Sequence, residues 1–106
     1  MMRFEFDPRK SAKNLRERNL PFGLVPAIFD GPRIEWIDRR KDYGEERIST
    51  LGVWHDEVYF VAYTSREEVV RIISFRKAKR KEARTFREHY HGGSKGLGPQ
   101  VRLVEG

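Results

Sequence analysis

The chain has 106 residues, and its 22 Arg and Lys against 16 Asp and Glu give a net charge of +6. Its length suits one domain, and a 38% hydrophobic content supports one modest core but not two. No apolar run approaches the roughly 20 residues of a membrane-spanning helix, and the lack of cysteine excludes disulfides and thiolate metal sites.

The basic balance favours anionic partners, such as a nucleic acid or an acidic protein segment. The first residues, MMRFEFDP, lack the apolar stretch of a secretory signal peptide. We therefore expect a cytoplasmic protein that does not associate with membranes.

A short strand and a helix are predicted at the start of the chain. Residues 3–7 alternate in polarity, as in a half-buried strand. Asp7 followed by Pro8 is a helix-start signal, because Asp caps free N–H groups and Pro is tolerated in the first turn. The helix should cover residues 8–18, with Ala12 and Leu15 as its narrow buried stripe.

A second short helix is expected over residues 22–29, after Asn19 ends the first one. Pro26 fits this helix only within its first turn, since a deeper proline would break it. The turn residues Asp30-Gly31-Pro32 then stop the element.

Four strand-like runs follow in close succession. They cover residues 33–38, 47–53, 58–65 and 69–75. The last two links are short enough for hairpins, and short links require antiparallel neighbours. The sequence thus predicts an α+β fold, with an antiparallel β-sheet of about four to five strands packed against the two N-terminal helices.

A basic helix is expected over residues 77–90, where Ala83, Phe86 and Tyr90 form a narrow docking stripe. The domain should therefore span residues 1–90, and the Gly-rich residues 91–106 should form a flexible tail. Whether the VRLV sequence near the end docks as a strand stays open.

The strongest chemical signal is the stretch RIISFRKAKRKEARTFR, residues 71–87, in which eight of seventeen residues are Arg or Lys. A strand that leads directly into a basic helix gathers cations at one edge of a sheet, which suits phosphate-rich ligands. His89 and His91 are too weak a pair to indicate a metal site, and no nucleophile motif is present. We expect neither a metal nor a cofactor.

An arginine cluster with a few carboxylates can supply the groups that metal-independent RNA cleavage needs. RNA supplies its own nucleophile, the 2′-hydroxyl, and arginine binds phosphate through a planar fork. The protein must add a base and an acid. Candidates are Glu46, Glu82, His55 and Tyr63, although each also has a structural interpretation: paired carboxylates, a turn residue and a core tyrosine.

Several motifs occur in an order and at a spacing that together are specific. They are RFEFDPRKSAKN at 3–14, FDGP at 29–32, D-x-x-x-D-x-GEERI at 38–48, Gly52, VAYTSRE at 61–67 and RIISFRKAKRKEARTF at 71–86. With these motifs the chain resembles the BrnT family of type II toxins, relatives of the RelE-like ribonuclease toxins, from about Arg3 to Tyr90. The resemblance implies a RelE-like fold and an endoribonuclease that blocks translation.

The resemblance also implies partners. A BrnA-like antitoxin with a ribbon-helix-helix part would hold the toxin inactive, and the pair would bind operator DNA through the antitoxin. A dimer or a two-plus-two heterotetramer is the implied assembly. Carried over by position, the expected catalytic residues are Arg47, Arg71, Arg76, Glu46 and Glu82. The expected RNA-binding residues are Lys10, Asn14, Lys77, Lys79 and Arg80.

The chain departs from the family pattern at two places. Arg18-Asn19-Leu20 stands where the family has a KHG-like turn, and Phe75 stands where it tends to have a small residue. The alternative is therefore a non-catalytic module that binds RNA or an acidic partner through the same cations.

Overall fold

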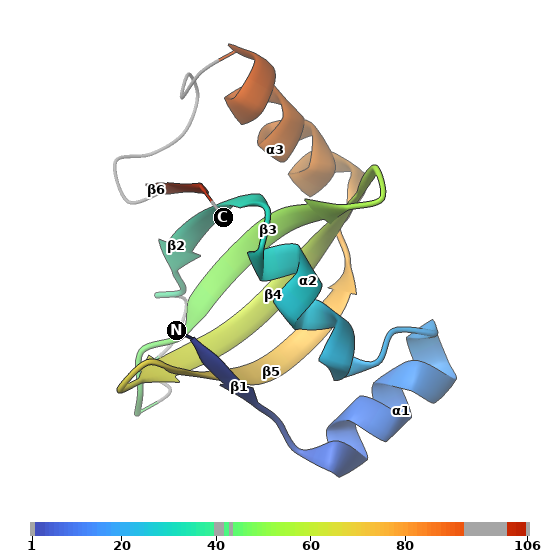
Figure 1. The fold of residues 1–106 in the computed structure, drawn as a ribbon. Helices are drawn as coiled ribbons and strands as arrows, with labels where there is room; N and C mark the ends of the chain where they lie inside the picture. Colours follow the sequence, from blue (N-terminus) through green and yellow to red (C-terminus); the bar gives the residue numbers. More distant parts are fainter. Residues whose placement is uncertain (1, 40–41, 43, 93–101, 106) are drawn as a thin grey trace.

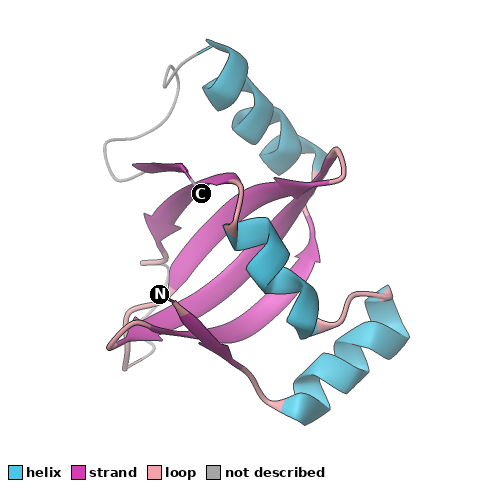
Figure 2. Cartoon of the chain, viewed as in Figure 1, coloured by secondary structure: helices cyan, strands magenta, loops and turns pink. Residues whose placement is uncertain are grey.

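The computed structural model describes residues 2–39, 42, 44–92 and 102–105, which form an α+β fold around one sheet (Figures 1 and 2). The strands are β1 (Arg3–Glu5), β2 (Pro32–Ile37), β3 (Ile48–Trp54), β4 (Glu57–Arg66), β5 (Val69–Lys77) and β6 (Arg102–Glu105). Their order in the sheet is β1-β5-β4-β3-β2-β6. The helices are α1 (Pro8–Arg18), α2 (Val25–Phe29), which follows a 3-10 turn at Phe22–Leu24, and α3 (Arg80–Gly92).

The predicted antiparallel meander is confirmed from β2 to β5. Two-residue turns close its last two hairpins, His55-Asp56 and Glu67-Glu68, and all four residues have positive φ between 49° and 68°. Both turns therefore have the left-handed backbone that matches the twist of paired strands.

The sheet differs from the prediction at both edges. It is mixed and has six strands in the described part of the chain, because β1 pairs in parallel with β5 and β6 pairs with β2. Neither edge strand is joined to its neighbour by a short link, so hairpin reasoning could not place it. The predicted flexible tail, residues 91–106, is wrong at two places, because residues 91 and 92 end α3 and residues 102–105 form β6. Residues 93–101 and 106 lie outside the described residues.

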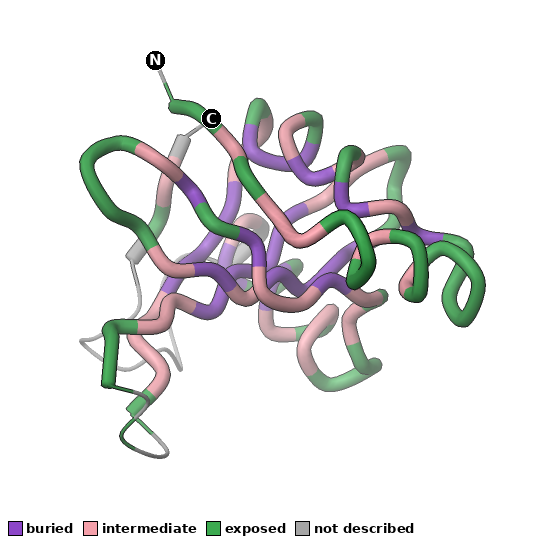
Figure 3. The backbone as a smooth tube through the Cα atoms, turned by 90° about the horizontal axis from the view of Figure 1, so that it is seen from below, coloured by how far each residue is buried: buried purple, intermediate pink, exposed green. Residues whose placement is uncertain are grey.

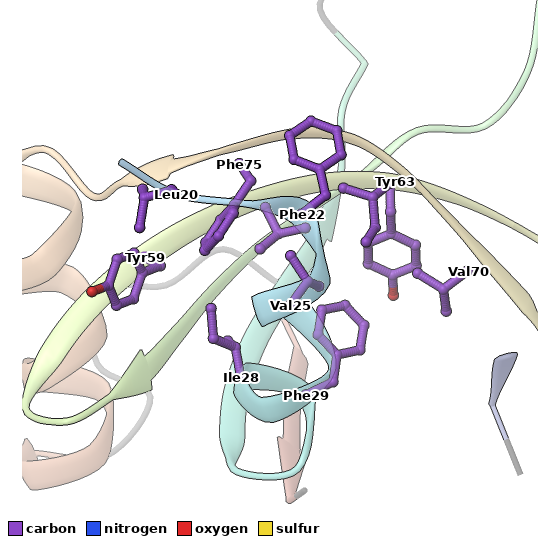
Figure 4. Close-up of a cluster of buried hydrophobic side chains, with 11 residues drawn as sticks. Leu20, Phe22, Val25, Ile28, Phe29, Tyr59, Tyr63, Val70 and Phe75 are labelled. Atoms are coloured by element: carbon purple, nitrogen blue, oxygen red, sulfur yellow. The ribbon is translucent and has the colours of Figure 1, made fainter. Parts of the chain in front are cut away.

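One face of the sheet carries α2 and the larger apolar cluster (Figure 4). Its buried members are Leu20, Phe22, Val25, Ile28, Phe29, Tyr59, Val61, Tyr63, Val70, Ile72 and Phe75. Pro26 lies in the first turn of α2, as its chemistry requires. Helix α2 approaches β3 closely because Gly52 has no side chain: a Cβ there would lie 2.7 Å from Cγ2 of Ile28.

The other face carries α3. Along β4, Val58 and Phe60 alternate with the residues of the first cluster, and they pack with Phe86 of the helix. Ala83 and Tyr90 are partly buried against them, so the predicted docking stripe is confirmed. Figure 3 shows the buried positions gathered along the middle of the molecule. No helix in the described part of the chain is long and apolar enough to cross a membrane.

Helix α3 begins at Arg80, three residues later than predicted, because Lys77 still pairs with Tyr59 in the sheet. The bounds of α1 agree with the prediction. Asp7 caps its start by accepting a hydrogen bond from the Arg9 N–H, and Asn19 ends it with a left-handed φ of 59°.

The predicted packing of α1 is wrong. None of its residues is buried, and the Leu15 side chain is 46% exposed. The helix is held instead through polar atoms: Asn14 Nδ2 donates to the carbonyls of Leu20 and Phe75, and Ser11 Oγ accepts from the Phe22 N–H. Figure 1 places α1 at a corner of the molecule, beside the end of the sheet rather than over it.

Candidate functional site

A groove of about 710 Å³ opens on the α3 side of the sheet, at the N-terminal end of that helix. It is lined by Trp36, Ile37, Asp38, Arg39, Arg47, Ser49, Phe60, Ala62, Ile73, Ser74, Arg76, Lys79 and Glu82. The lining combines four cations with two carboxylates and two aromatic rings. Such a mixture can bind both the phosphate and the base of a nucleotide.

Arg76 is held in the groove by a carboxylate and an aromatic ring. Its Nη1 and Nη2 atoms donate to the two carboxylate oxygens of Glu82 at 2.8 and 3.1 Å. Its Cζ lies 4.1 Å from the ring centroid of Phe60, a cation–π contact. Within the described residues no hydrogen bond uses its Nε–H, so the side edge of the guanidinium can still bind a phosphate.

Glu82 is the anchor of Arg76. The hydrogen bond from Arg76 holds the pKa of this carboxyl below its ordinary value of 4.5, against the opposing effect of burial, and the Lys79 N–H adds to the lowering. Glu82 lies in the first turn of α3 and accepts a hydrogen bond from the N–H of Lys79, three residues before it, as in one half of a capping box. The carboxylate is therefore ionised at neutral pH.

An irregularity in β5 places Arg76 in the groove. Tyr63 pairs with Ile72 and Ala62 pairs with Ser74, so one extra residue stands in β5. Ile72 and Phe75, three residues apart, can then both be buried on the α2 side. Residues 73, 74 and 76 line the groove on the other side.

Arg47 is brought to the same groove from the start of β3. Its Nε lies 3.7 Å from Oε1 of Glu45, which is longer than a hydrogen bond. Glu46 next to it is exposed and does not line the groove, and its carbonyl accepts a hydrogen bond from Thr64 Oγ1 at 2.9 Å.

Arg71 is not part of this groove. Its side chain is 53% exposed and its Nη1 lies 3.2 Å from Oε1 of Glu5, on β1. Together with Glu45, Thr64 and Arg66 it lines a separate hollow of about 480 Å³ near the β4–β5 turn. The structure thus groups Arg47, Arg76 and Glu82 and places Arg71 elsewhere.

The expected RNA-binding residues have different surroundings. Lys79 lines the groove, whereas the exposed Lys77 faces Glu57 with its Nζ 3.5 Å from the carboxylate. Arg80 is exposed on α3, and Lys10 is exposed on α1. Asn14 uses its amide to hold α1 against the chain, since its Nδ2 makes two hydrogen bonds.

The remaining acid and base candidates lie outside the groove. Tyr63 is buried and donates a 2.6 Å hydrogen bond to Glu35, and His55 stacks on Trp54 at the hairpin turn. Among the described residues, no group of three or more His, Asp or Glu could hold a metal ion.

Sequence reasoning missed the aromatic wall of the groove, above all Phe60. Counting back from the β4–β5 turn would pair Phe60 with Phe75, because the extra residue in β5 gives no sequence signal. The observed partner is Arg76. A cross-strand contact between the arginine and the ring could therefore not be predicted.

The family model described as "Ribonuclease toxin, BrnT, of type II toxin-antitoxin system" matches residues 6–82 of the chain. No curated protein matches the chain. Because the family model covers most of the sequence, the chain belongs to the BrnT family of ribonuclease toxins from type II toxin–antitoxin systems.

Proposed function

We propose that this toxin cleaves RNA in the groove at Arg76, without a metal ion, and so inhibits translation. The observation that supports the proposal most is the geometry of Arg76, which is fixed between Glu82 and Phe60 with one edge directed at no protein acceptor in the described chain. A cation fixed in advance stabilises developing charge better than one that must reorganise.

In the proposed reaction the 2′-oxygen of a ribose attacks the adjacent phosphorus and loses its proton to a base. The bond from phosphorus to the 5′-oxygen breaks, and that oxygen takes up a proton. The products are a 2′,3′-cyclic phosphate and a 5′-hydroxyl end. Arg76 and Arg47 bind the phosphate oxygens while negative charge builds up on them.

The two carboxylates differ in this proposal. Both oxygens of Glu82 are bound to Arg76, so Glu82 acts as a positioning residue. Glu46 is exposed next to Arg47 but does not line the groove, so it is not assigned as the base. Arg71, together with Lys10, Lys77 and Arg80, would contact the RNA outside the groove, and Lys79 inside it.

A non-catalytic RNA-binding module is the second candidate. The observation that favours it is the bidentate Arg76–Glu82 pair, which already satisfies both terminal nitrogens of the arginine. Such a module would bind RNA with salt-sensitive affinity and would leave it intact.

The test is incubation of the purified protein, free of antitoxin, with RNA in EDTA. The proposal predicts fragments that end in 2′,3′-cyclic phosphate and that accumulate beyond one turnover. Intact RNA in the presence of well-folded protein would favour the binding module.

A type II toxin family implies an antitoxin partner. Our proposal specifies a BrnA-like protein with a ribbon-helix-helix part, which would carry the complex to operator DNA as a dimer or a two-plus-two heterotetramer. Co-purification with the product of the neighbouring gene, followed by mass measurement and operator binding, tests this partner.

A further inference from the structure

Helix α1 presents an apolar stripe that the described residues of this chain leave exposed. Pro8, Ala12 and Leu15 follow each other at the i, i+4 and i+7 spacing of one helix face, and all three are exposed. The side of α1 that contacts the rest of the chain is instead the polar one, with Ser11 and Asn14. The apolar stripe therefore lies about a quarter turn around the helix from the side that contacts the rest of the chain.

Cations border the stripe. Arg9 and Arg16 lie seven residues apart, two turns along one face of the helix, and that face adjoins Ala12 on the side away from Asn14. The helix carries five basic residues, Arg9, Lys10, Lys13, Arg16 and Arg18, against one acidic residue, Glu17. The exposed stripe thus has a strongly positive border.

We propose that α1 is a docking surface for an acidic amphipathic helix of a partner protein. Apolar side chains of the partner would cover Leu15 and Ala12, and its carboxylates would pair with Arg9 and Arg16. This is a helix-on-helix recognition mode, in which apolar anchors give affinity and the charged border sets the orientation. The antitoxin that the family implies is a protein partner of the required kind.

The two other possible occupants fit this surface less well. A second copy of the chain would bring Arg9 and Arg16 against the same cations, and like charges in an interface are unfavourable. RNA would neutralise the cations, but its phosphates would leave Leu15 uncovered. The surface is also separate from the groove, since no residue of α1 lines it.

The proposal can be tested with the full chain and a fluorescent synthetic peptide of about 18 residues, long enough for a helix of five turns. The peptide carries Leu at alternating three- and four-residue spacing, flanked by Glu, and a peptide of the same composition in scrambled order is the reference. Anisotropy titrations would measure its affinity for the wild type and for three variants. The variants are Leu15→Lys, the double variant Arg9→Gln/Arg16→Gln, and Leu103→Lys.

Leu103 supplies the matched control, because it is 44% exposed and lies on β6, at the other edge of the sheet from β1. We expect Leu15→Lys to bind the peptide about tenfold more weakly although it adds a positive charge, and the double variant about fivefold more weakly. Leu103→Lys should bind like the wild type, and the scrambled peptide should bind about tenfold more weakly than the ordered one.

The proposal would be overturned if Leu15→Lys bound the peptide as tightly as the wild type or more tightly. It would also be overturned if the wild type bound the scrambled and the ordered peptide equally. Either result would mean that charge attraction alone explains the binding. A loss of RNA affinity in Leu15→Lys would also overturn the proposal, because Lys10, the RNA contact proposed on α1, lies on a different face of the helix from Leu15. So would a wild-type dimer that dissociates in this variant. Failure of peptide binding is distinguishable from failure of the proposed ribonuclease activity, because RNA cleavage is measured separately and should be unchanged in Leu15→Lys.

Discussion

Two arginine–glutamate pairs lie on opposite faces of the sheet and have the same local construction. Arg33 binds Glu35 with its Nε 3.2 Å from Oε2, and its Cζ lies 4.3 Å from the ring centroid of Phe29. Arg76 binds Glu82, and its Cζ lies 4.1 Å from the Phe60 centroid. Each pair is thus a cation held by one carboxylate and one aromatic ring.

Burial separates the two pairs. The side chains of the first pair are 3% and 1% exposed, and those of the second are 23% and 24% exposed. Around the first pair, Thr50 and Tyr63 donate to Oε2 of Glu35, and Arg33 Nη1 donates to the Phe29 carbonyl. The first pair therefore ties α2 to the sheet, whereas the second is presented in the groove, where a ligand can reach it.

The largest expected effect is on stability, from Glu35→Ala. This variant leaves the Arg33 charge buried without its carboxylate, which should lower the free energy of unfolding by about 3–5 kcal/mol. Urea unfolding followed by circular dichroism measures the change. In the matched variant Glu82→Ala the loss should be below about 1 kcal/mol, because the second pair is partly solvated. Equal losses in both variants would remove the distinction between the pairs.

The variant Arg76→Lys tests whether the Arg76–Glu82 pair of the groove contributes to RNA cleavage. Lysine keeps the charge but loses the planar fork, so it cannot bind Glu82 and a phosphate at the same time in the same geometry. We expect RNA cleavage to fall about 100-fold, with an unchanged circular dichroism spectrum. Cleavage at the wild-type rate would show that charge alone is needed.

Phe60→Leu and Phe29→Leu compare the two rings. Loss of the cation–π contact at Phe60 should reduce kcat for RNA cleavage about fivefold, since such contacts contribute about 1 kcal/mol. Phe29→Leu should lower stability and leave kcat unchanged. Steady-state kinetics at a temperature where both variants are folded separates the effects. A kcat that falls equally in both would contradict a specific role for Phe60.

The smallest expected effect is a dependence of stability on pH. Arg76 lowers the pKa of Glu82 from 4.5 in the folded chain, so the ionised carboxylate stabilises the fold above about pH 4.5. This contribution is lost as the pH falls through the lowered pKa. The difference in unfolding free energy between wild type and Glu82→Gln should therefore be constant near neutral pH and shrink in acid. A constant difference down to the acid limit would contradict the pairing.

Local sequence signals predicted the elements well. The cap residues Asp7 and Asn19 bound α1 as expected, and alternation with short links gave the meander from β2 to β5. The spacing of Ala83, Phe86 and Tyr90 predicted the docking stripe of α3, and all three pack in the second apolar cluster.

Long-range features could not be predicted. The parallel partner of β1 is separated from it by more than 60 residues, and no turn fixes the register. The extra residue in β5 moves Arg76 opposite Phe60 and carries no sequence signal. The expected site residues Arg47, Arg76 and Glu82 meet in one groove. Arg71 lies nearer the β4–β5 turn, before the extra residue, and lines another hollow.

In the proposed mechanism Arg76, and not the equally basic Arg71, lies at the reacting phosphate. The direct measurement is single-turnover cleavage of one RNA in EDTA by Arg76→Ala and Arg71→Ala, both verified as folded. We expect the cleavage rate of Arg76→Ala to be about 100-fold or more below that of the wild type, and that of Arg71→Ala to be less than about tenfold below it. Equal losses, or a larger loss for Arg71→Ala, would contradict it.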